Sequence, residues 1–119
     1  MQGIDQVVQQ NFTIYRGTSP TLRFTRTLNG SISGATVRFS VRMTRDAADP
    51  LVLDVLGTVV DAGSVSTPGV VTVALTKANT QALSVRPYAF SLERVDTGQE
   101  NLWTRGTMTV ELDVRNAAP

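Results

Sequence analysis

The feature that most constrains the fold is the strict alternation of apolar and polar residues in the segment ATVRFSVRMTR, residues 35–45. Because successive side chains of a strand point to opposite sides, this period of two predicts a strand with one buried face and one solvated face. The buried face is predicted to hold Val37, Phe39, Val41 and Met43. Half-buried strands of this kind are typical of antiparallel sheets.

Similar alternation recurs along the chain between segments of turn composition such as NGSISG and DAGSVSTPG. It covers residues 11–15, 21–28, 69–76, 87–95 and 106–114, and residues 50–60 hold one or two more strands broken at Gly57. The last alternating segment is predicted to turn four residues inward: Met108, Val110, Leu112 and Val114. Short strands at this spacing predict an all-β, antiparallel, immunoglobulin-like β-sandwich of about seven to eight strands.

One segment departs from this alternation. Residues 77–83, KANTQAL, contain alanine and glutamine, which favour a helix, and Thr76 before them suits an N-cap. They predict one helical crossover turn that brings Leu83 back over the core, and Pro87 ends any helix. At Tyr88, which starts the next strand, we expect a tyrosine corner, in which the hydroxyl bonds the backbone a few residues upstream.

Length and charge narrow the class of protein. A chain of 119 residues fits one domain, which can bury about two-thirds of its unfolded surface without disulfides. The formal net charge is +1, so no strong field draws in nucleic acid. No apolar run approaches the roughly 20 residues that a transmembrane helix needs. We therefore expect neither a specific nucleic acid nor a membrane as a partner.

The chain contains neither cysteine nor histidine, which removes the commonest nucleophile–base pairs and the commonest zinc ligands. An enzyme would then need a carboxylate pair, drawn from Asp46, Asp49, Glu93 and Glu100. These residues lack the spacing of a calcium loop, and the two aspartates lie in turn composition. We expect no enzyme, no cofactor and no metal, and we assign no catalytic residue.

The chain is predicted to have three parts. Residues 1–10 are polar and rich in glutamine, and are predicted to form an N-terminal arm outside the core. Residues 11–115 contain the alternating segments and form the sandwich domain. Residues 116–119 form a C-terminal tail.

Arginine gives the least ordinary surface signal, since Lys77 is the only lysine among the 11 basic residues. Arg38 and Arg42 share the outer face of one predicted strand, and Arg23 points outward from the strand before it. A patch of arginines suits an acidic partner or a protein interface. Trp103 is added to this candidate interface because tryptophan and arginine are typical of binding hot spots. A solvated face is the ordinary alternative.

Taken in order, several segments resemble a known family. They are NFTIYRGTSPTLRFTR, GATVRFSVRM, GVVTVALTKANTQAL, YAFSLERVDTG and LWTRGTMTVELDV, which span about residues 11–115. This order is similar to the immunoglobulin-like N-terminal domain of phage baseplate upper proteins, and to related tail and head-fibre proteins of tailed bacteriophages. In that family an opening strand ends in glycine, as in YRG here, and the last strand is entered through G-x-x-x-V.

The resemblance implies a structural virion protein of tail or baseplate type, made in the cytoplasm of the host bacterium. Such a protein acts by assembly, so its partners would be other virion proteins and copies of itself in a homo-oligomer. The family supplies no catalytic residue. Two alternatives stay open: a capsid decoration or head–tail joining protein, and a carbohydrate- or host-surface-binding module, which would need exposed aromatic side chains or a polar cleft.

Overall fold

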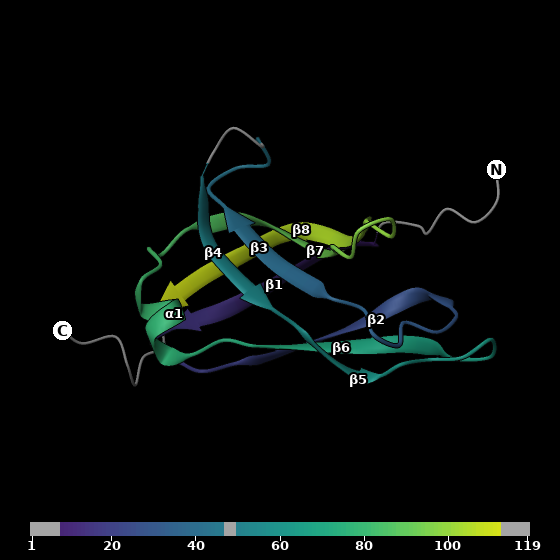
Figure 1. Ribbon diagram of the computed structural model, residues 1–119. Helices are drawn as coiled ribbons and strands as arrows, with labels where there is room; N and C mark the ends of the chain where they lie inside the picture. The colour runs from purple at the N-terminus through teal and green to yellow at the C-terminus, as the bar shows by residue number, and fades with distance from the viewer. Residues whose placement is uncertain (1–7, 47–49, 113–119) are drawn as a thin grey trace.

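The alternating segment that predicts the fold forms β3 (Val37–Arg42), an inner strand of a five-stranded sheet. A three-stranded sheet packs against the inner face of this sheet (Figure 1). The computed structural model describes residues 8–46 and 50–112. The two sheets confirm the predicted β-sandwich.

The strands are short and ordered as follows. Across the five-stranded sheet they are β1 (Val8–Arg16), β8 (Asn101–Leu112), β7 (Pro87–Arg94), β3 and β4 (Leu51–Leu56). Across the three-stranded sheet they are β2 (Thr21–Asn29), β6 (Pro68–Ala74) and β5 (Thr58–Asp61).

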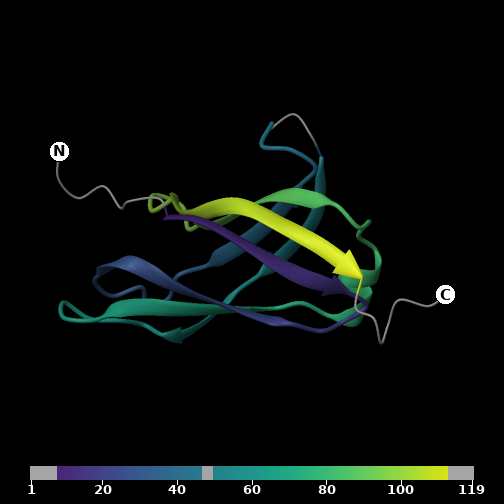
Figure 2. The same cartoon turned by 180° about the vertical axis from the view of Figure 1, so that it is seen from behind.

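The connections make the sandwich immunoglobulin-like. The chain changes sheet between β1 and β2, between β2 and β3, between β4 and β5, and between β6 and β7. β1 runs parallel to β8, and the other paired strands are antiparallel. Figure 2 shows β1 and β8 side by side and pointing the same way. This is the immunoglobulin arrangement, in which a Greek key distributes the strands over two sheets.

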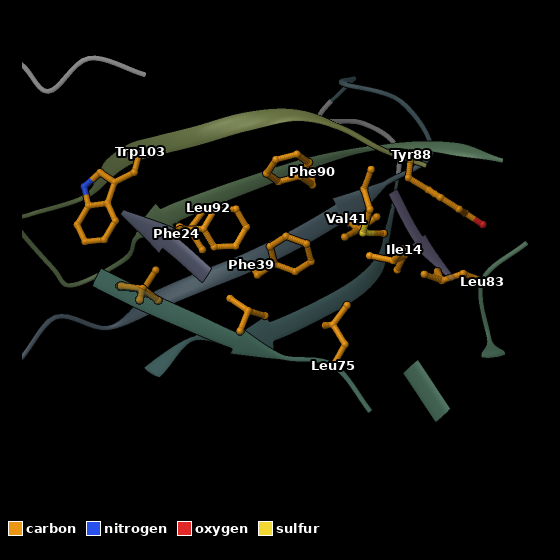
Figure 3. Packing of buried hydrophobic residues seen from close by; sticks show 14 of the residues in the cluster. Ile14, Phe24, Phe39, Val41, Leu75, Leu83, Tyr88, Phe90, Leu92 and Trp103 are labelled. Carbon is orange, nitrogen blue, oxygen red and sulfur yellow. The ribbon is translucent and has the colours of Figure 1, made fainter. Parts of the chain in front are cut away.

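Aromatic packing fills the space between the sheets (Figure 3). The ring of Phe90 lies 4.9 Å from that of Phe12, 5.6 Å from that of Phe39 and 6.1 Å from that of Phe24, measured between centroids. These contacts join strands of both sheets, because Phe24 lies on β2 and the others lie on the five-stranded sheet. Each fully buried phenylalanine contributes roughly 1.5–3 kcal/mol to folding.

The helix-favouring segment forms α1 (Lys77–Gln81), which closes one end of the sandwich. Thr76 is its N-cap: the threonine hydroxyl accepts from the Asn79 N–H, and the Asn79 side chain accepts from the Thr76 N–H. This reciprocal capping satisfies donors that a helix end leaves without partners. Leu83 follows the helix and is buried, so the predicted crossover turn is confirmed.

Some predicted boundaries need correction. β1 begins at Val8, so residues 8–10, assigned to the N-terminal arm, belong to the sheet because their backbones pair with β8. Met43 follows the end of β3 and is exposed, as is Leu112 at the end of β8, because the facing sheet does not cover these positions. Val114, residues 1–7 and the predicted boundary at residue 115 lie outside the described residues.

Within the described part of the chain, no helix has the length and apolar character needed to cross a membrane.

Candidate interaction face

The outer face of the five-stranded sheet is hollowed where neighbouring strands present small side chains. Ser40 of β3, Ser91 of β7 and Arg105 of β8 lie in one row, because their backbones pair across the sheet. In the next row Ala89 pairs with Arg42. Serine and alanine fill little space above a sheet, so the longer side chains around them enclose a groove.

This groove has a volume of about 250 Å³. The lining includes Thr44 and Arg45, which follow the end of β3. The charged residues of the lining are three arginines and one glutamate: Arg42, Arg45, Arg105 and Glu93. A guanidinium group binds a carboxylate through paired N–H donors. The groove therefore suits an acidic group better than a basic one.

A glutamine on the edge strand β1 lies between two of these arginines. With its amide oxygen turned toward β8, Gln9 accepts a hydrogen bond from Nε of Arg105 at 2.7 Å. In the opposite orientation the same oxygen accepts from Nη2 of Arg45 at 3.4 Å. In either orientation this neutral amide accepts from one of the two guanidinium groups and leaves its charge uncancelled.

At the border of this face, Arg38 is paired with an acid. Its Nη1 lies 2.7 Å from Oδ2 of Asp54 on β4, and the two side chains are 41% and 32% exposed. A pair this exposed contributes only about 0–1 kcal/mol to stability. Its main consequence is that the charge of Asp54 is neutralised along the β3–β4 side of the sheet.

The predicted patch contained three arginines, and the prediction is wrong for one of them, which lies on the other sheet. Arg42 lines the groove, and Arg38 lies on the same face of β3. Arg23 lies on β2 and points outward from the three-stranded sheet, on the opposite side of the sandwich. The reason is that the chain changes sheet between β2 and β3, so the outer faces of these consecutive strands point in opposite directions.

The prediction that places Trp103 at an interface also needs correction, because its side chain is only 4% exposed and belongs to the core (Figure 3). A bulge in the β7–β8 ladder lies beside the pair of Glu93 with Leu102. The extra residue on β8 lets Leu102 face the groove while Trp103 turns inward. Cζ of Arg26 lies 5.8 Å from the centroid of the tryptophan ring, within cation–π range.

The two residues predicted to be structural lie in the core. The hydroxyl of Tyr88 accepts a hydrogen bond from the N–H of Ser84 at 2.8 Å, so the predicted tyrosine corner is present. Leu83, one residue before Ser84, is 3% exposed. Together they attach the crossover to the start of β7.

The acidic residues considered for catalysis serve separate local roles. Glu93 lies in the groove, whereas Glu100 accepts from the Gly98 N–H at 3.0 Å within the β7–β8 turn. The N–H of Asp46 donates to Oγ1 of Thr44, and Asp49 lies outside the described residues. Among residues 8–46 and 50–112, no three acidic side chains lie close enough to hold a metal ion.

Sequence reasoning missed Arg105 and Arg45. Periodicity could have found Arg105. Thr109 points outward from β8, and counting back along the strand in steps of two residues reaches Arg105, which therefore lies on the same outer face. The alternation over residues 35–45 would put Arg45 on the inward side, but β3 ends at Arg42, so the period no longer applies at Arg45. Arg105 and Arg45 line the groove together with Arg42, which the alternation correctly placed on the outer face.

Comparison with protein-family models finds no match, and comparison with curated proteins finds none. Among solved structures, the chain is similar to one from a study described as structure-based site-directed photo-crosslinking of multimeric cell-adhesive interactions of VGSC beta subunits. The sequences are 12% identical, the TM-score is 0.42, and the match covers 93% of this chain and 100% of the other. The fold assignment made above depends on the strand order and registers of this chain itself.

Proposed function

We propose that this chain is a structural component of a tailed-bacteriophage virion, of tail or baseplate type, that works by binding other virion proteins and not by catalysis. The observation that carries the proposal is the arginine-lined groove on the five-stranded sheet. It offers a recognition surface for an acidic protein segment. The resemblance of residues 11–115 to phage baseplate domains supplies the setting.

The chemistry of the groove favours binding over reaction. Its three arginines carry N–H donors and no acceptor. Ser40 and Ser91 carry hydroxyls, but the chain has no histidine, so the usual serine–histidine pair is missing and Glu93 is the one carboxylate of the lining. A groove with three guanidinium groups is suited to holding a carboxylate of a partner.

The fold is compatible with this role. The resemblance implies an immunoglobulin-like sandwich, and the strand order is of that kind. Because one fold serves many functions, the virion setting has to be decided by where the protein is found. Capsid decoration and head–tail joining use the same kind of protein contact, and they are alternative outcomes of the same experiment.

The carbohydrate-binding alternative has a polar groove in its favour but lacks the exposed aromatic rings. Sugar-binding surfaces use exposed aromatic rings, but Trp103 is buried in the core. Among the described residues, Tyr15, on β1, is the aromatic side chain with a large exposed area, at 45%. A single exposed tyrosine among polar neighbours does not form a stacking platform.

The test is to locate the protein in purified particles. Mass spectrometry of virions from a phage that encodes this chain should find it, and cross-linking should join the groove to an acidic segment of a tail or baseplate protein. Cross-links to capsid proteins would move the assignment to capsid decoration, and absence from purified particles would overturn the proposal.

Matched charge reversals test the groove itself. Arg42→Glu combined with Arg105→Glu should reduce incorporation into particles by about tenfold or more, because each removes a donor and adds a repelling carboxylate. Arg23→Glu is the control, since this exposed arginine lies on the other sheet. If the control lowers incorporation as much as the groove variant does, the groove is not the contact surface.

A further inference from the structure

Among the strands of the described residues, β3 is the one that pairs with β4, so the outer edge of β4 has backbone groups without a strand partner there. The N–H of Gly57 donates to the carbonyl of Val37 at 2.8 Å. This bond determines which residues of β4 direct their backbone groups toward β3. In an antiparallel ladder the bonded positions alternate, so Val55 faces β3 and its neighbours face away. The N–H and C=O groups of Asp54 and Leu56 therefore point to the open side of the sheet.

The side chains along this edge are unusually apolar for a free strand. Leu51 is 40% exposed, Val52 is 38% exposed and Leu56 is 58% exposed. Native proteins protect free edges with lysine, proline or unpaired charge, and an apolar edge without these devices tends to pair with another strand. Pro50 and a bulge in the ladder with β3 lie at the start of β4, but residues 53–56 beyond the bulge contain neither lysine nor proline, and the charge of Asp54 is paired with Arg38.

The other described edges are less suited to pairing. β5 has only four residues, and its register with β6 shifts between Val59 and Asp61. β2 is interrupted by a similar shift between Thr25 and Asn29. On β1, the other edge of the five-stranded sheet, the outer face begins with the polar residues Gln9 and Asn11. The apolar, charge-neutralised edge is thus β4.

We propose that β4 pairs antiparallel with β4 of a second copy of this chain, around a two-fold axis at Val55. The inference rests on the proposed function, for which the family resemblance implies assembly with copies of the same chain, and it names the surface. A two-fold axis makes an edge complementary to itself, because each copy offers the same donors and acceptors in opposite order. The paired segment is residues 54–56 of each copy, because Gly57 leads into β5 of the other sheet, and it joins the two five-stranded sheets edge to edge.

Charge and geometry select this register. When Val55 faces Val55 of the second copy, Asp54 of each copy lies opposite Leu56 of the other copy. Each Asp54 then lies in the same row as Arg38 of the second copy, because Arg38 and Leu56 are paired across β3 and β4. An axis at Asp54 would set two carboxylates opposite each other, which is unfavourable. An axis at Leu53 would involve the bulge at the start of β4.

Hydrogen exchange tests the pairing directly on the wild-type chain. The amides of Asp54 and Leu56 should exchange quickly in dilute solution and become protected as protein concentration rises. The amide of Val55, which already faces β3, should change little and serves as the internal control. If Asp54 and Leu56 exchange at a rate independent of concentration while the protein self-associates, the edge is not the contact.

Substitutions test the same surface by sedimentation. Leu56→Glu should weaken the dimer about tenfold or more, since it sets a second carboxylate opposite Asp54 of the other copy. Val60→Glu is the matched control, because Val60 is 52% exposed on the edge strand β5. The proposal fails if the wild-type chain remains monomeric at all concentrations, or if both variants weaken the dimer equally.

A designed disulfide tests the register. The chain has no cysteine, so Val55→Cys introduces a single thiol. Opposed residues that are not hydrogen-bonded to each other lie about 4.5 Å apart between Cα atoms, which a disulfide can span. Mild oxidation should cross-link Val55→Cys and not Val60→Cys; equal cross-linking would contradict the register.

Failure of this inference is separable from failure of the proposed function. Arg42→Glu with Arg105→Glu changes the groove and leaves the β4 edge intact, so it should lower incorporation into particles without changing self-association. Leu56→Glu should do the reverse: it should weaken self-association in sedimentation and leave the groove unchanged. A protein absent from virions but dimeric through β4 would overturn the first proposal alone.

Discussion

The hydroxyl of Tyr88 accepts a hydrogen bond from the backbone N–H of Ser84 at 2.8 Å, which closes the crossover onto the start of β7. Tyr88→Phe keeps the buried ring and removes this acceptor. We expect the free energy of unfolding to fall by about 1 kcal/mol, measured by urea denaturation. Tyr15→Phe, at an exposed position, should change it little. Equal stability of wild type and Tyr88→Phe would mean that water replaces the hydroxyl without cost.

Thr80 links α1 to the turn between β1 and β2. It is fully buried, its hydroxyl donates to the carbonyl of Thr18 at 2.7 Å, and it accepts from the N–H of Gly17 at 3.0 Å. Thr80→Val keeps the shape and leaves two backbone groups without their partner, so we expect a loss of about 1–3 kcal/mol in thermal or urea unfolding. Thr109→Val, on the outer face of β8, is the control and should change stability by less than about 0.5 kcal/mol.

Gly106 lets β1 approach β8. A Cβ at this position would overlap the carbonyl oxygen of Gln10, which is backbone and cannot rotate away. Gly106→Ala should therefore displace β1 and lower stability by about 3 kcal/mol or more, with faster hydrogen exchange along β1. Gly98→Ala is the control: its Cβ would meet nothing within 4 Å, although φ is +84°, so about 1 kcal/mol is expected. Similar losses for both variants would rule out the close contact as the cause.

The alternation of apolar and polar residues was enough to predict the β-sandwich and the strand β3. The physical reason is that one buried face imposes a period of two wherever a strand covers the core. The same reasoning predicted the cap at Thr76 and the corner at Tyr88, because both depend on local chemistry. These features require no knowledge of which strands become neighbours.

The candidate site was less accessible because it depends on long-range pairing. Periodicity predicts that Arg23 and Arg42 point outward from their strands. It does not predict that β2 and β3 belong to different sheets. Trp103 was misplaced because one extra residue in β8 reverses the order of inward and outward positions. A bulge has no reliable sequence signal when the residues around it are both apolar, as Leu102 and Trp103 are.

Asp96 gives the fold a dependence on acid. Its carboxylate accepts from the N–H of Thr36 at 2.7 Å and lies 2.9 Å from Nε of Arg94, so it ties the β7–β8 turn to the chain just before β3. The hydrogen bond from Thr36 lowers the pKa of Asp96 from 3.8, burial opposes this change, and Arg94 adds to it. A carboxyl whose pKa is lower in the folded state stabilises the fold when it is ionised.

The sign of the pH effect follows from that shift. The contribution of Asp96 is fully present above its unfolded pKa, near 3.8, and is lost as pH falls through the lower folded value. Asp96→Asn should therefore be less stable than wild type above about pH 5, and the difference should shrink as the pH is lowered below the unfolded pKa. Urea unfolding at a series of pH values measures this difference. If the two stability curves stay parallel through the acid range, ionisation of Asp96 does not contribute to folding.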